Sequence, residues 1–376
     1  MTGVPDTADV VIVGGGIVGV ATAFQLAEAG VRDVVVLERG AVGSGATGQA
    51  AGIITLQAGS EADLRLQIES VAAHVRFCGA VGIDLEAHGS LLLWTSDGEA
   101  NVARRRVAMH AALGLQIELL DGEEVRRRFP YLAVDDIVVA TFSGADPWTM
   151  PLAAVRRIAD AARARGATIC EGCELTGVDV SGGHVRRVLT PHGAISTPVV
   201  VNAAGAWARA VGALAGARIP VAPRKRQVFV LDPGGTLPPN TPFIQEEARD
   251  FCCMARPEGL IMVCGQPAGE TYDPTVEWGY LDDALQPTLR RVPGLGHAPV
   301  TGAWAGIRPI TPDGAPMLGA IPDIEGYLVA GGLGGQGFAR GPLVGRIMAE
   351  LITTGQTSLD LSPYRPDRFA RAGRSR

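Results

Sequence analysis

The 376-residue sequence lacks an excess of positive charge and any long apolar run. Its formal net charge of −6, without a long basic stripe, gives no electrostatic footprint for nucleic acid. No run of 18 or more apolar residues occurs, so we expect no membrane span. Residues 1–7 lack the basic residues of a secretory signal peptide. We therefore expect a cytoplasmic protein.

Cysteines are few, and Cys170 and Cys173 form a CxxC arrangement. The segment TICEGCEL around this pair favours a strand and a turn over a metal or redox site, and the other four cysteines have no ligand spacing. We expect free thiols in a reducing compartment and no metal site. The Arg-rich end, residues 365–376, is interpreted as a solvated tail.

Glycine, in contrast, is abundant, and the most informative glycines lie in residues 8–38. An apolar run at residues 10–13 predicts a buried parallel strand that stops at a glycine. Residues 17–29 then favour a helix, which Gly30 ends. A second apolar run, residues 34–37, completes a βαβ unit that presents Glu38 at its carboxyl end.

The glycine spacing in this unit is GxGxxG, and each position has a physical role. Gly14 allows the turn, Gly16 lets the backbone approach a pyrophosphate, and Gly19 lets the helix pack closely on the strand. The helix N-terminus attracts phosphate, while Glu38 accepts hydrogen bonds from ribose hydroxyls and repels a 2′-phosphate. Among 50 glycines the spacing alone is weak, but the strand, helix and acidic residue in register predict an adenine dinucleotide.

The length predicts two domains, and the remaining pattern is mixed. Helices are predicted at residues 61–77, 103–113, 121–129 and 150–166. Strands are predicted at residues 89–95, 168–170, 175–180 and 185–189. From residue 220 to 299, proline-punctuated alternation indicates antiparallel strands of a second domain.

Three further segments are rich in small residues where ligands commonly bind. Residues 40–55 form a loop suited to contact a flat ligand or its diphosphate, with a flexible linker as the alternative. An apolar strand beginning at residue 199 ends in Ala203-Ala204-Gly205, at the edge where open α/β sheets bind ligands. Residues 327–352 again predict strand, glycine loop and helix, with the helix N-terminus near Gly337.

Taken together, these segments resemble the D-amino acid oxidase-like flavoprotein family, and within it the glycine oxidase and sarcosine oxidase groups, including the sarcosine oxidase β-subunit. The segments are VVIVGGGIVG, GSGATGQAAG, VVNAAGAWA, WAGIRPITPDGAPMLG and GGLGGQGFARGPLVG. They cover nearly the whole chain, and only the first would also occur in a simple NAD enzyme.

The resemblance implies an α/β fold with a Rossmann-type FAD-binding domain and a second α+β substrate domain built on a mainly antiparallel sheet. The expected FAD-binding segments are residues 1–85, 146–219 and 300–364. The expected substrate-domain segments are residues 86–145 and 220–299, and the tail is 365–376.

The cofactor that the resemblance implies is FAD, held by residues of the glycine turn, the second loop, two strand ends and the last glycine loop. These are Gly14, Gly16, Ile17, Val18, Gly19, Glu38, Arg39, Ser44, Ala46, Thr47, Ala51, Gly52, Ile53, Val178, Ala204, Gly205, Trp207, Arg308, Gly334, Gly335, Gln336, Gly337 and Phe338. Sarcosine oxidases with covalent flavin carry a cysteine where Gly306 stands, so we predict that FAD is bound non-covalently.

On the substrate side, Arg308 lies where family members hold a carboxylate, and a guanidinium suits that planar pairing. Without the resemblance, a surface salt bridge would be the simpler interpretation of Arg308. Gln336 replaces a histidine of the sarcosine oxidases, and Arg340 is expected to assist Arg308. Phe251 and Cys253 are expected over the substrate, where relatives place aromatic or tyrosine residues.

The electron acceptor is left open, as either O₂ or an electron carrier. Monomeric sarcosine oxidase promotes its reaction with oxygen through a lysine at the position where Val263 stands here. The only lysine of the chain, Lys225, is interpreted as a solvated charge at a sheet edge. Glycine oxidase-like proteins also lack the lysine, so its absence does not exclude an oxidase.

The leading hypothesis is oxidation of the C–N bond of a small amino acid or N-alkyl amino acid by hydride transfer to flavin N5, with hydrolysis of the resulting imine. Glycine, sarcosine, proline and D-amino acids are the candidate substrates. The alternatives are an FAD-dependent 2-hydroxy acid dehydrogenase, which would need a general base, and a β-like subunit active only with a heteromeric partner. A homo-oligomer is also left open.

Overall fold

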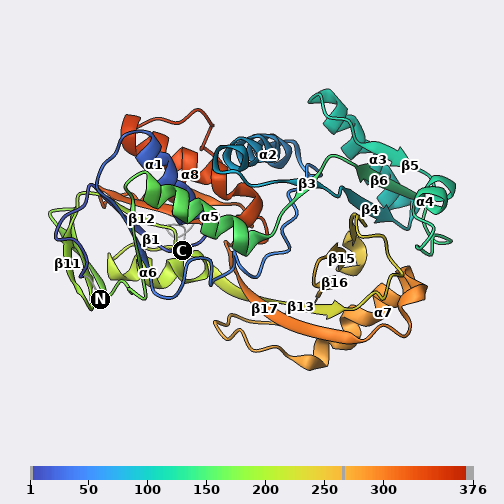
Figure 1. Cartoon of the computed structure of the whole chain (residues 1–376). Helices are drawn as coiled ribbons and strands as arrows, with labels where there is room; N and C mark the ends of the chain where they lie inside the picture. The colour runs from blue at the N-terminus through green and yellow to red at the C-terminus, as the bar shows by residue number, and fades with distance from the viewer. Residues whose placement is uncertain (1–2, 265–266, 370–376) are drawn as a thin grey trace, which may run out of the picture.

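Two large sheets organise the chain, as the computed structural model in Figure 1 shows. It describes residues 3–264 and 267–369. The six-stranded sheet has the order β18-β19-β12-β1-β2-β8, and the eight-stranded sheet the order β17-β13-β16-β15-β14-β4-β6-β5. A Rossmann-type unit beside a mainly antiparallel sheet is the predicted fold class, and it is confirmed.

The six-stranded sheet is parallel except at one edge, where β18 pairs antiparallel with β19. Its strands are β1 Val10–Val13, β2 Val34–Glu38, β8 Thr168–Glu171, β12 Val200–Asn202, β18 Met317–Ala320 and β19 Tyr327–Gly331. All four residues of β1 are buried, as expected for a strand covered on both faces. The carboxyl ends of β1, β2, β12 and β19 therefore meet at one edge of the sheet.

Helices α1 (Ile17–Glu28), α2 (Glu61–Val81), α5 (Pro151–Ala164) and α8 (Gly337–Thr354) share one apolar core with this sheet. Glycines allow α1 and α8 to approach closely. A Cβ on Gly341 would lie 2.6 Å from Ile17 Cγ1, and one on Gly345 would lie 2.7 Å from the Ala21 backbone. The N-termini of both helices are thereby fixed beside each other, on the side of the carboxyl ends of the strands.

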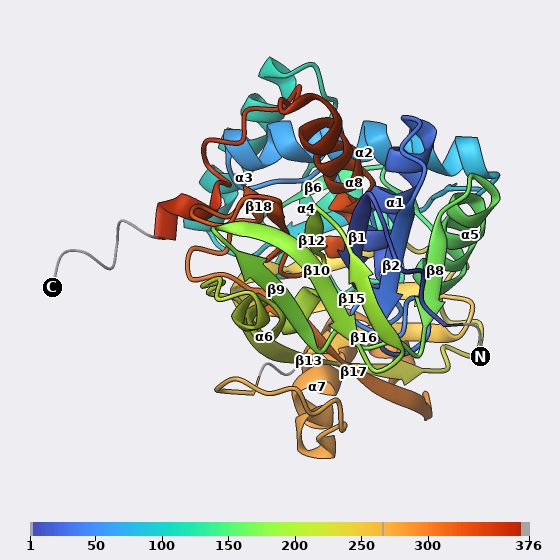
Figure 2. The ribbon, with the colours of Figure 1, turned by 90° about the vertical axis from the view of Figure 1, so that its left-hand side faces the viewer.

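A second apolar core lies on the other face of the six-stranded sheet, under a small antiparallel sheet and α6 (Ala208–Leu214). The small sheet consists of β9 Gly177–Ser181, β10 His184–Thr190 and β11 Gly193–Ser196. Figure 2 shows β9 and β10 toward the viewer, in front of this core. Gly182 and Gly183 form the hairpin turn between β9 and β10, and both have positive φ.

The eight-stranded sheet is antiparallel except that β14 pairs parallel with β4. Its strands are β4 Ser90–Trp94, β5 Glu118–Leu120, β6 Val139–Ser143, β13 Ala222–Leu231, β14 Phe243–Glu246, β15 Phe251–Arg256, β16 Gly259–Cys264 and β17 Val300–Ile310. Helices α4 (Gly122–Arg128) and α7 (Leu281–Arg291) flank it. The long strands β13 and β17 run from the centre of the molecule to its far end (Figure 1).

Several element boundaries differ from expectation, and two of these differences have an identifiable cause. Strand β17 lies at the start of residues 300–364, which are predicted to bind FAD. It instead belongs to the eight-stranded sheet, where it pairs with β13 over residues Val300 to Ile310. Helix α3 (Asp97–Ala112) begins six residues before the predicted start at 103, because Ser96 caps it by accepting a hydrogen bond from the Glu99 N–H at 3.4 Å. Its polar first turn carries no apolar periodicity that would reveal a helix.

The remaining elements are short. They are β3 Glu86–Ala87, β7 Pro147–Trp148 and the 3₁₀ helices Gly205–Trp207, Glu247–Arg249, Trp278–Tyr280, Pro293–Leu295 and Pro366–Phe369. Of the predicted tail, Arg368 is held on the body of the molecule by Asp313, at 2.8 Å, while residues 370–376 lie outside the described residues. Among the helices that the structure describes, none combines the length and apolar character needed to cross a bilayer.

Candidate cofactor and substrate site

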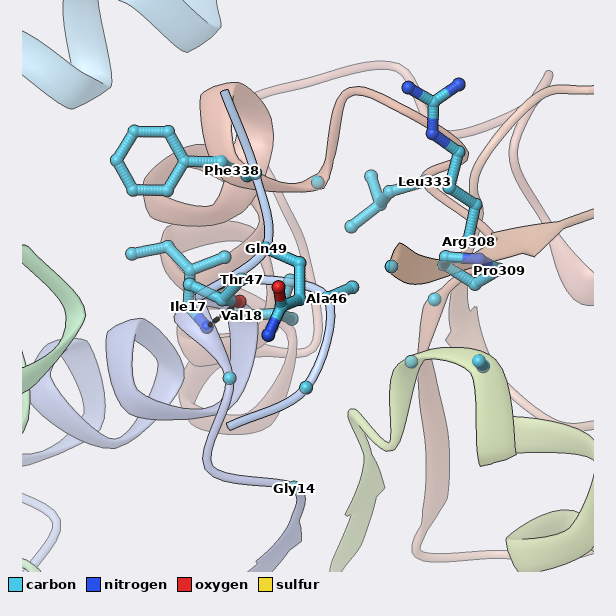
Figure 3. A pocket seen from close by; sticks show the side chains of 18 of the residues that line it. Gly14, Ile17, Val18, Ala46, Thr47, Gln49, Arg308, Pro309, Leu333 and Phe338 are labelled. Atoms are coloured by element: carbon cyan, nitrogen blue, oxygen red, sulfur yellow. Dashed lines mark hydrogen bonds between the residues drawn. The ribbon is translucent and has the colours of Figure 1, made fainter. Parts of the chain in front are cut away.

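A cavity of about 940 Å³ lies between the carboxyl edge of the six-stranded sheet and one face of the eight-stranded sheet. Most of the predicted site residues line it. These are Gly14, Gly16, Ile17, Val18, Glu38, Arg39, Ser44, Ala46, Thr47, Ala51, Gly52, Ile53, Ala204, Gly205, Trp207, Arg308, Gly334, Gly335, Gln336, Gly337 and Phe338. Figure 3 shows Gly14 and Arg308 on opposite sides of this cavity, with the loop carrying Ala46, Thr47 and Gln49 between them.

Two glycines of the GxGxxG segment leave no room for a side chain. Gly14 has φ +116°, and a Cβ there would lie 2.5 Å from the Ala203 carbonyl oxygen. A Cβ on Gly19 would lie 1.9 Å from the Gly14 oxygen, so this glycine packs α1 on the strand without lining the cavity. The N–H of Ile17 donates to Thr47 Oγ1 at 3.1 Å, which ties the start of α1 to the second loop. The glycine turn and the start of α1 therefore let backbone N–H groups come close to a pyrophosphate.

Glu38 closes the turn at the end of β2. Its two carboxylate oxygens accept hydrogen bonds from the N–H of Gly15, at 2.7 Å, and of Gly40, at 2.8 Å. Each oxygen keeps a second lone pair for a further donor, such as a ribose hydroxyl. Next to it, the Arg39 guanidinium lies 3.9 Å from the Trp207 ring centroid, so these two residues form one wall of the cavity.

The second loop is fixed by hydrogen bonds on both sides. The N–H of Gly43 donates to the Gly15 oxygen at 3.0 Å, and the Trp148 indole N–H donates to the Ala51 oxygen at 3.0 Å. Gly52 has φ +95°, and a Cβ there would lie 2.3 Å from the Thr149 oxygen. The segment is therefore an ordered wall of the cavity rather than a flexible linker.

The last glycine loop leads into α8, whose first turn reads GFAR and contains no acidic residue. The N–H groups of this turn, and the positive end of the helix dipole, lie at the cavity. Phe338 packs edge to face on the His74 ring, with the ring centroids 5.1 Å apart. Burial lowers the pKa of His74 to about 4, so this histidine is neutral near pH 7.

Arg308 reaches the cavity from β17, beside the start of α8. A Cβ on Gly335 would stand 3.3 Å from Arg308 Cζ, so the absence of a side chain at Gly335 makes room for the guanidinium. Burial, and then the charge of Arg226, lower the pKa of Arg308 to about 10. Within residues 3–264 and 267–369, Arg308 has no hydrogen bond or ion pair from its side chain. A buried cation without a partner is stabilised by an anion, so Arg308 can bind an anionic group of a ligand in the cavity.

The predicted position of Phe251 and Cys253 over the substrate is wrong. Both side chains lie in the apolar core on the far face of the eight-stranded sheet, 3% and 0% exposed. Side chains alternate between the two faces of a strand, so it is Cys252 that lines the cavity. Burial raises the pKa of the Cys252 thiol to about 11, which keeps it protonated near pH 7.

Two further predicted residues lie away from the cavity. Val178, predicted at the cofactor, packs in the core under the small sheet. Arg340, predicted to assist Arg308, is 6% exposed and forms an ion pair with Asp63 across the interface of α2 and α8. Although Ala339 lines the cavity, the side chain of Arg340 points toward α2 instead.

The interpretation of Lys225 as a solvated charge is also wrong. The side chain is 3% exposed, and its ammonium contacts Glu277 Oε1 at 2.8 Å and the Thr275 oxygen at 2.9 Å. On the same strand, Arg226 and Val228 face the cavity instead. The only lysine of the chain is thus committed to an ion pair on the opposite face of the sheet.

The sequence does not predict most of the lining residues that lie on or next to β13, β14, β15 and β16. The missed lining residues with polar side chains are Arg226, Gln245, Asp250 and Cys252 on this side, and Gln49, Thr55, Cys173, Glu174 and Thr176 elsewhere around the cavity. Alternation along the strand PRKRQVF could have separated Arg226 from Lys225, once the face toward the cavity was known. Asp250 carried no motif that could reveal it.

Comparison with known proteins bears directly on this cavity. The chain matches the family model described as FAD dependent oxidoreductase, DAO, over residues 9–351. A glycine oxidase of Geobacillus kaustophilus is 30% identical, over 95% of this chain and 96% of that protein. The mitochondrial sarcosine dehydrogenase of Mus musculus is 29% identical over 97% of this chain, but the chain spans only 42% of that relative's length.

Solved structures show the same fold along the whole chain. An L-proline dehydrogenase from P. horikoshii has a TM-score of 0.93 and 30% sequence identity, over 98% of this chain and 99% of that chain. The glycine oxidase structure from Geobacillus kaustophilus has a TM-score of 0.87 and 28% identity, over 96% of this chain and 98% of that one.

Proposed function

Since the chain belongs to the DAO family of FAD-dependent oxidoreductases, we propose that it oxidises the C–N bond of a small amino acid or N-alkyl amino acid. The observation that carries this proposal is Arg308, whose guanidinium lies in the cavity beside the N-terminus of α8 and has no ion-pair partner among the described residues. Its fork of N–H donors matches a substrate carboxylate. The names of the relatives, which include glycine, sarcosine and proline enzymes, support the same substrate class.

The residues present fit FAD. Gly14 and Gly16 leave the backbone open to a pyrophosphate, and Glu38 offers acceptors to ribose hydroxyls. The turn that begins α8 offers backbone N–H groups to the electron-rich edge of the flavin ring. When bound, FAD supplies the two-electron acceptor for oxidation of the carbon that bears the amine.

The side chains of the chain then have three tasks. Arg308 binds the carboxylate and thereby orients the substrate in the cavity. Burial in the cavity lowers the pKa of the substrate ammonium, which favours the neutral amine needed for oxidation. Phe243, Val228 and Val263 give the sheet side an apolar surface that excludes water.

The test is anaerobic titration of the purified, FAD-loaded protein with glycine, sarcosine, proline, D-alanine and lactate. Bleaching of the flavin absorbance by an amine supports the proposal, and Arg308→Ala should then raise the concentration of amine needed. Arg187→Ala is a matched control, because Arg187 pairs with Asp179 on the distant small sheet. Bleaching by lactate alone would favour the 2-hydroxy acid alternative.

The hydroxy acid alternative has less support. An alcohol needs a general base to accept its proton, and histidine is the usual one. Among the described lining residues none is a histidine, and His74 lies behind Phe338. The partner-dependent alternative is tested by the same titration, because turnover by the isolated chain would exclude it.

A further inference from the structure

Two guanidinium groups lie on the same face of the eight-stranded sheet, and both line the cavity. Arg226 on β13 pairs with Gly306 on β17, and Arg308 follows two residues further along β17. Residues two apart on a strand share a face, so the two arginines are diagonal neighbours across the sheet. Their mutual repulsion contributes to the lowered pKa of Arg308.

The two arginines differ in what they bind. Arg308 has no partner within the described ranges, as noted above. Arg226 forms a fork with the carboxylate of Asp250, with Nη1–Oδ2 at 2.8 Å and Nη2–Oδ1 at 2.6 Å. Asp250 also lines the cavity, and its side chain is 67% exposed while that of Arg226 is 10% exposed. The carboxylate of Asp250 thus already occupies Arg226, the second group of the cavity that could bind a substrate carboxylate.

We propose that Asp250 determines substrate specificity, by occupying Arg226 and so excluding substrates that carry a second carboxylate. This inference rests on the proposed function and adds the substrate class, namely amines with one carboxylate and an uncharged substituent. Arg308 takes the single carboxylate. A second carboxylate near Arg226 must either displace Asp250 from a bidentate pair or stay beside its negative charge.

The rest of the floor agrees with an uncharged substituent. Val228 lies opposite Val263, and Val263 lies opposite Cys252. The next residue in this row is Gln245, and all four line the cavity. The row offers apolar surface and one neutral amide, and Cys252 is protonated near neutral pH.

The backbone at Asp250 allows a clean test. Its φ of 46° is in the left-handed region, where asparagine and glycine are well tolerated. Asp250→Asn keeps the shape of the side chain and removes its charge, while Asp250→Gly removes the side chain altogether. Glu270→Gln is the matched control, because Glu270 forms a similar fork with Arg209 but does not line the cavity.

The experiment uses the FAD-loaded protein and two inert probes, acetate and malonate, whose binding is measured by calorimetry at neutral pH. Wild type and Glu270→Gln should prefer acetate. In Asp250→Asn and Asp250→Gly the affinity ratio of malonate to acetate should rise at least tenfold, because the guanidinium of Arg226 no longer binds the Asp250 carboxylate. The activity ratio of N-(carboxymethyl)glycine to N-methylglycine should rise in parallel.

Either of two results overturns the inference: a wild type that already binds malonate more tightly than acetate, or Asp250 variants that keep FAD and thermal stability but leave the ratio unchanged. Absence of binding of both probes to the wild type also overturns it. If no amine bleaches the flavin, the proposed function fails. The affinity ratio of malonate to acetate then still decides whether Asp250 prevents a second carboxylate from binding Arg226.

Discussion

The two sides of the cavity are built from different chemical groups. On the side of the six-stranded sheet the lining is dominated by glycine turns, backbone N–H groups and helix N-termini, with a few side chains such as Glu38. On the side of the eight-stranded sheet it consists of side chains from five strands, Arg226 and Arg308 among them. The first side suits a dinucleotide whatever the substrate, and the second selects the substrate. Changes to the two sides should therefore have separable effects.

The largest effect is expected on the backbone side, from Gly19→Ala. The new Cβ would lie 1.9 Å from the Gly14 oxygen, so α1 must move away from the strand that carries the turn. We expect a loss of about 3 kcal/mol in the free energy of unfolding and purification without FAD. Thermal unfolding and flavin absorbance measure the two effects. Gly98→Ala, in α3 with open space around it, is the control and should be neutral or stabilising.

The next effect is expected on the side-chain side, from Arg308→Ala. Loss of a charged hydrogen-bond pair should raise the apparent KM of the amine substrate about 100-fold, while FAD stays bound. Arg308→Lys should recover part of this loss, since it keeps the charge but not the fork. Steady-state kinetics and flavin content measure both. An unchanged KM in Arg308→Ala would remove Arg308 from the substrate side.

The pH dependence of acetate binding should report the same group. Arg308 binds a carboxylate only while it is protonated, and its pKa is lowered to about 10. Acetate affinity should therefore be constant between pH 7 and 9 and fall about tenfold per pH unit above about pH 10, because the free protein loses the Arg308 proton while the complex keeps it. Calorimetric titration across this range measures the effect. Constant affinity to pH 11 would contradict the lowered pKa.

The smallest effects should separate the two faces of β15. Cys253→Ser places a hydroxyl in the apolar core and should lower the free energy of unfolding by about 1–3 kcal/mol without changing the KM. Cys252→Ser faces the cavity and should change the KM a few-fold, with a smaller loss of stability. Denaturant unfolding and kinetics of both variants test this. The reverse pattern would place Cys253 at the substrate.

The sequence predicts the backbone side well because its signals are local. The strand at residues 10–13, the glycines after it and Glu38 lie within 30 residues, and their roles follow from backbone geometry. The interpretation fails where the decisive fact is non-local. Strand β17 begins at the predicted boundary of residue 300, yet it belongs to the eight-stranded sheet. Its partner there is β13, a strand far away in the sequence, so no local signal could reveal the pairing.

The sequence by itself determined the fold class, the dinucleotide turn and the position of Arg308 in a recognisable motif. Only the tertiary structure decided which face of β15 meets the cavity, and hence that Cys252 and not Cys253 lies there. It also decided that Lys225 is buried in an ion pair and that Asp250 binds Arg226. The physical reason is strand register, because a shift of one residue exchanges the two faces of a strand and no local signal fixes it.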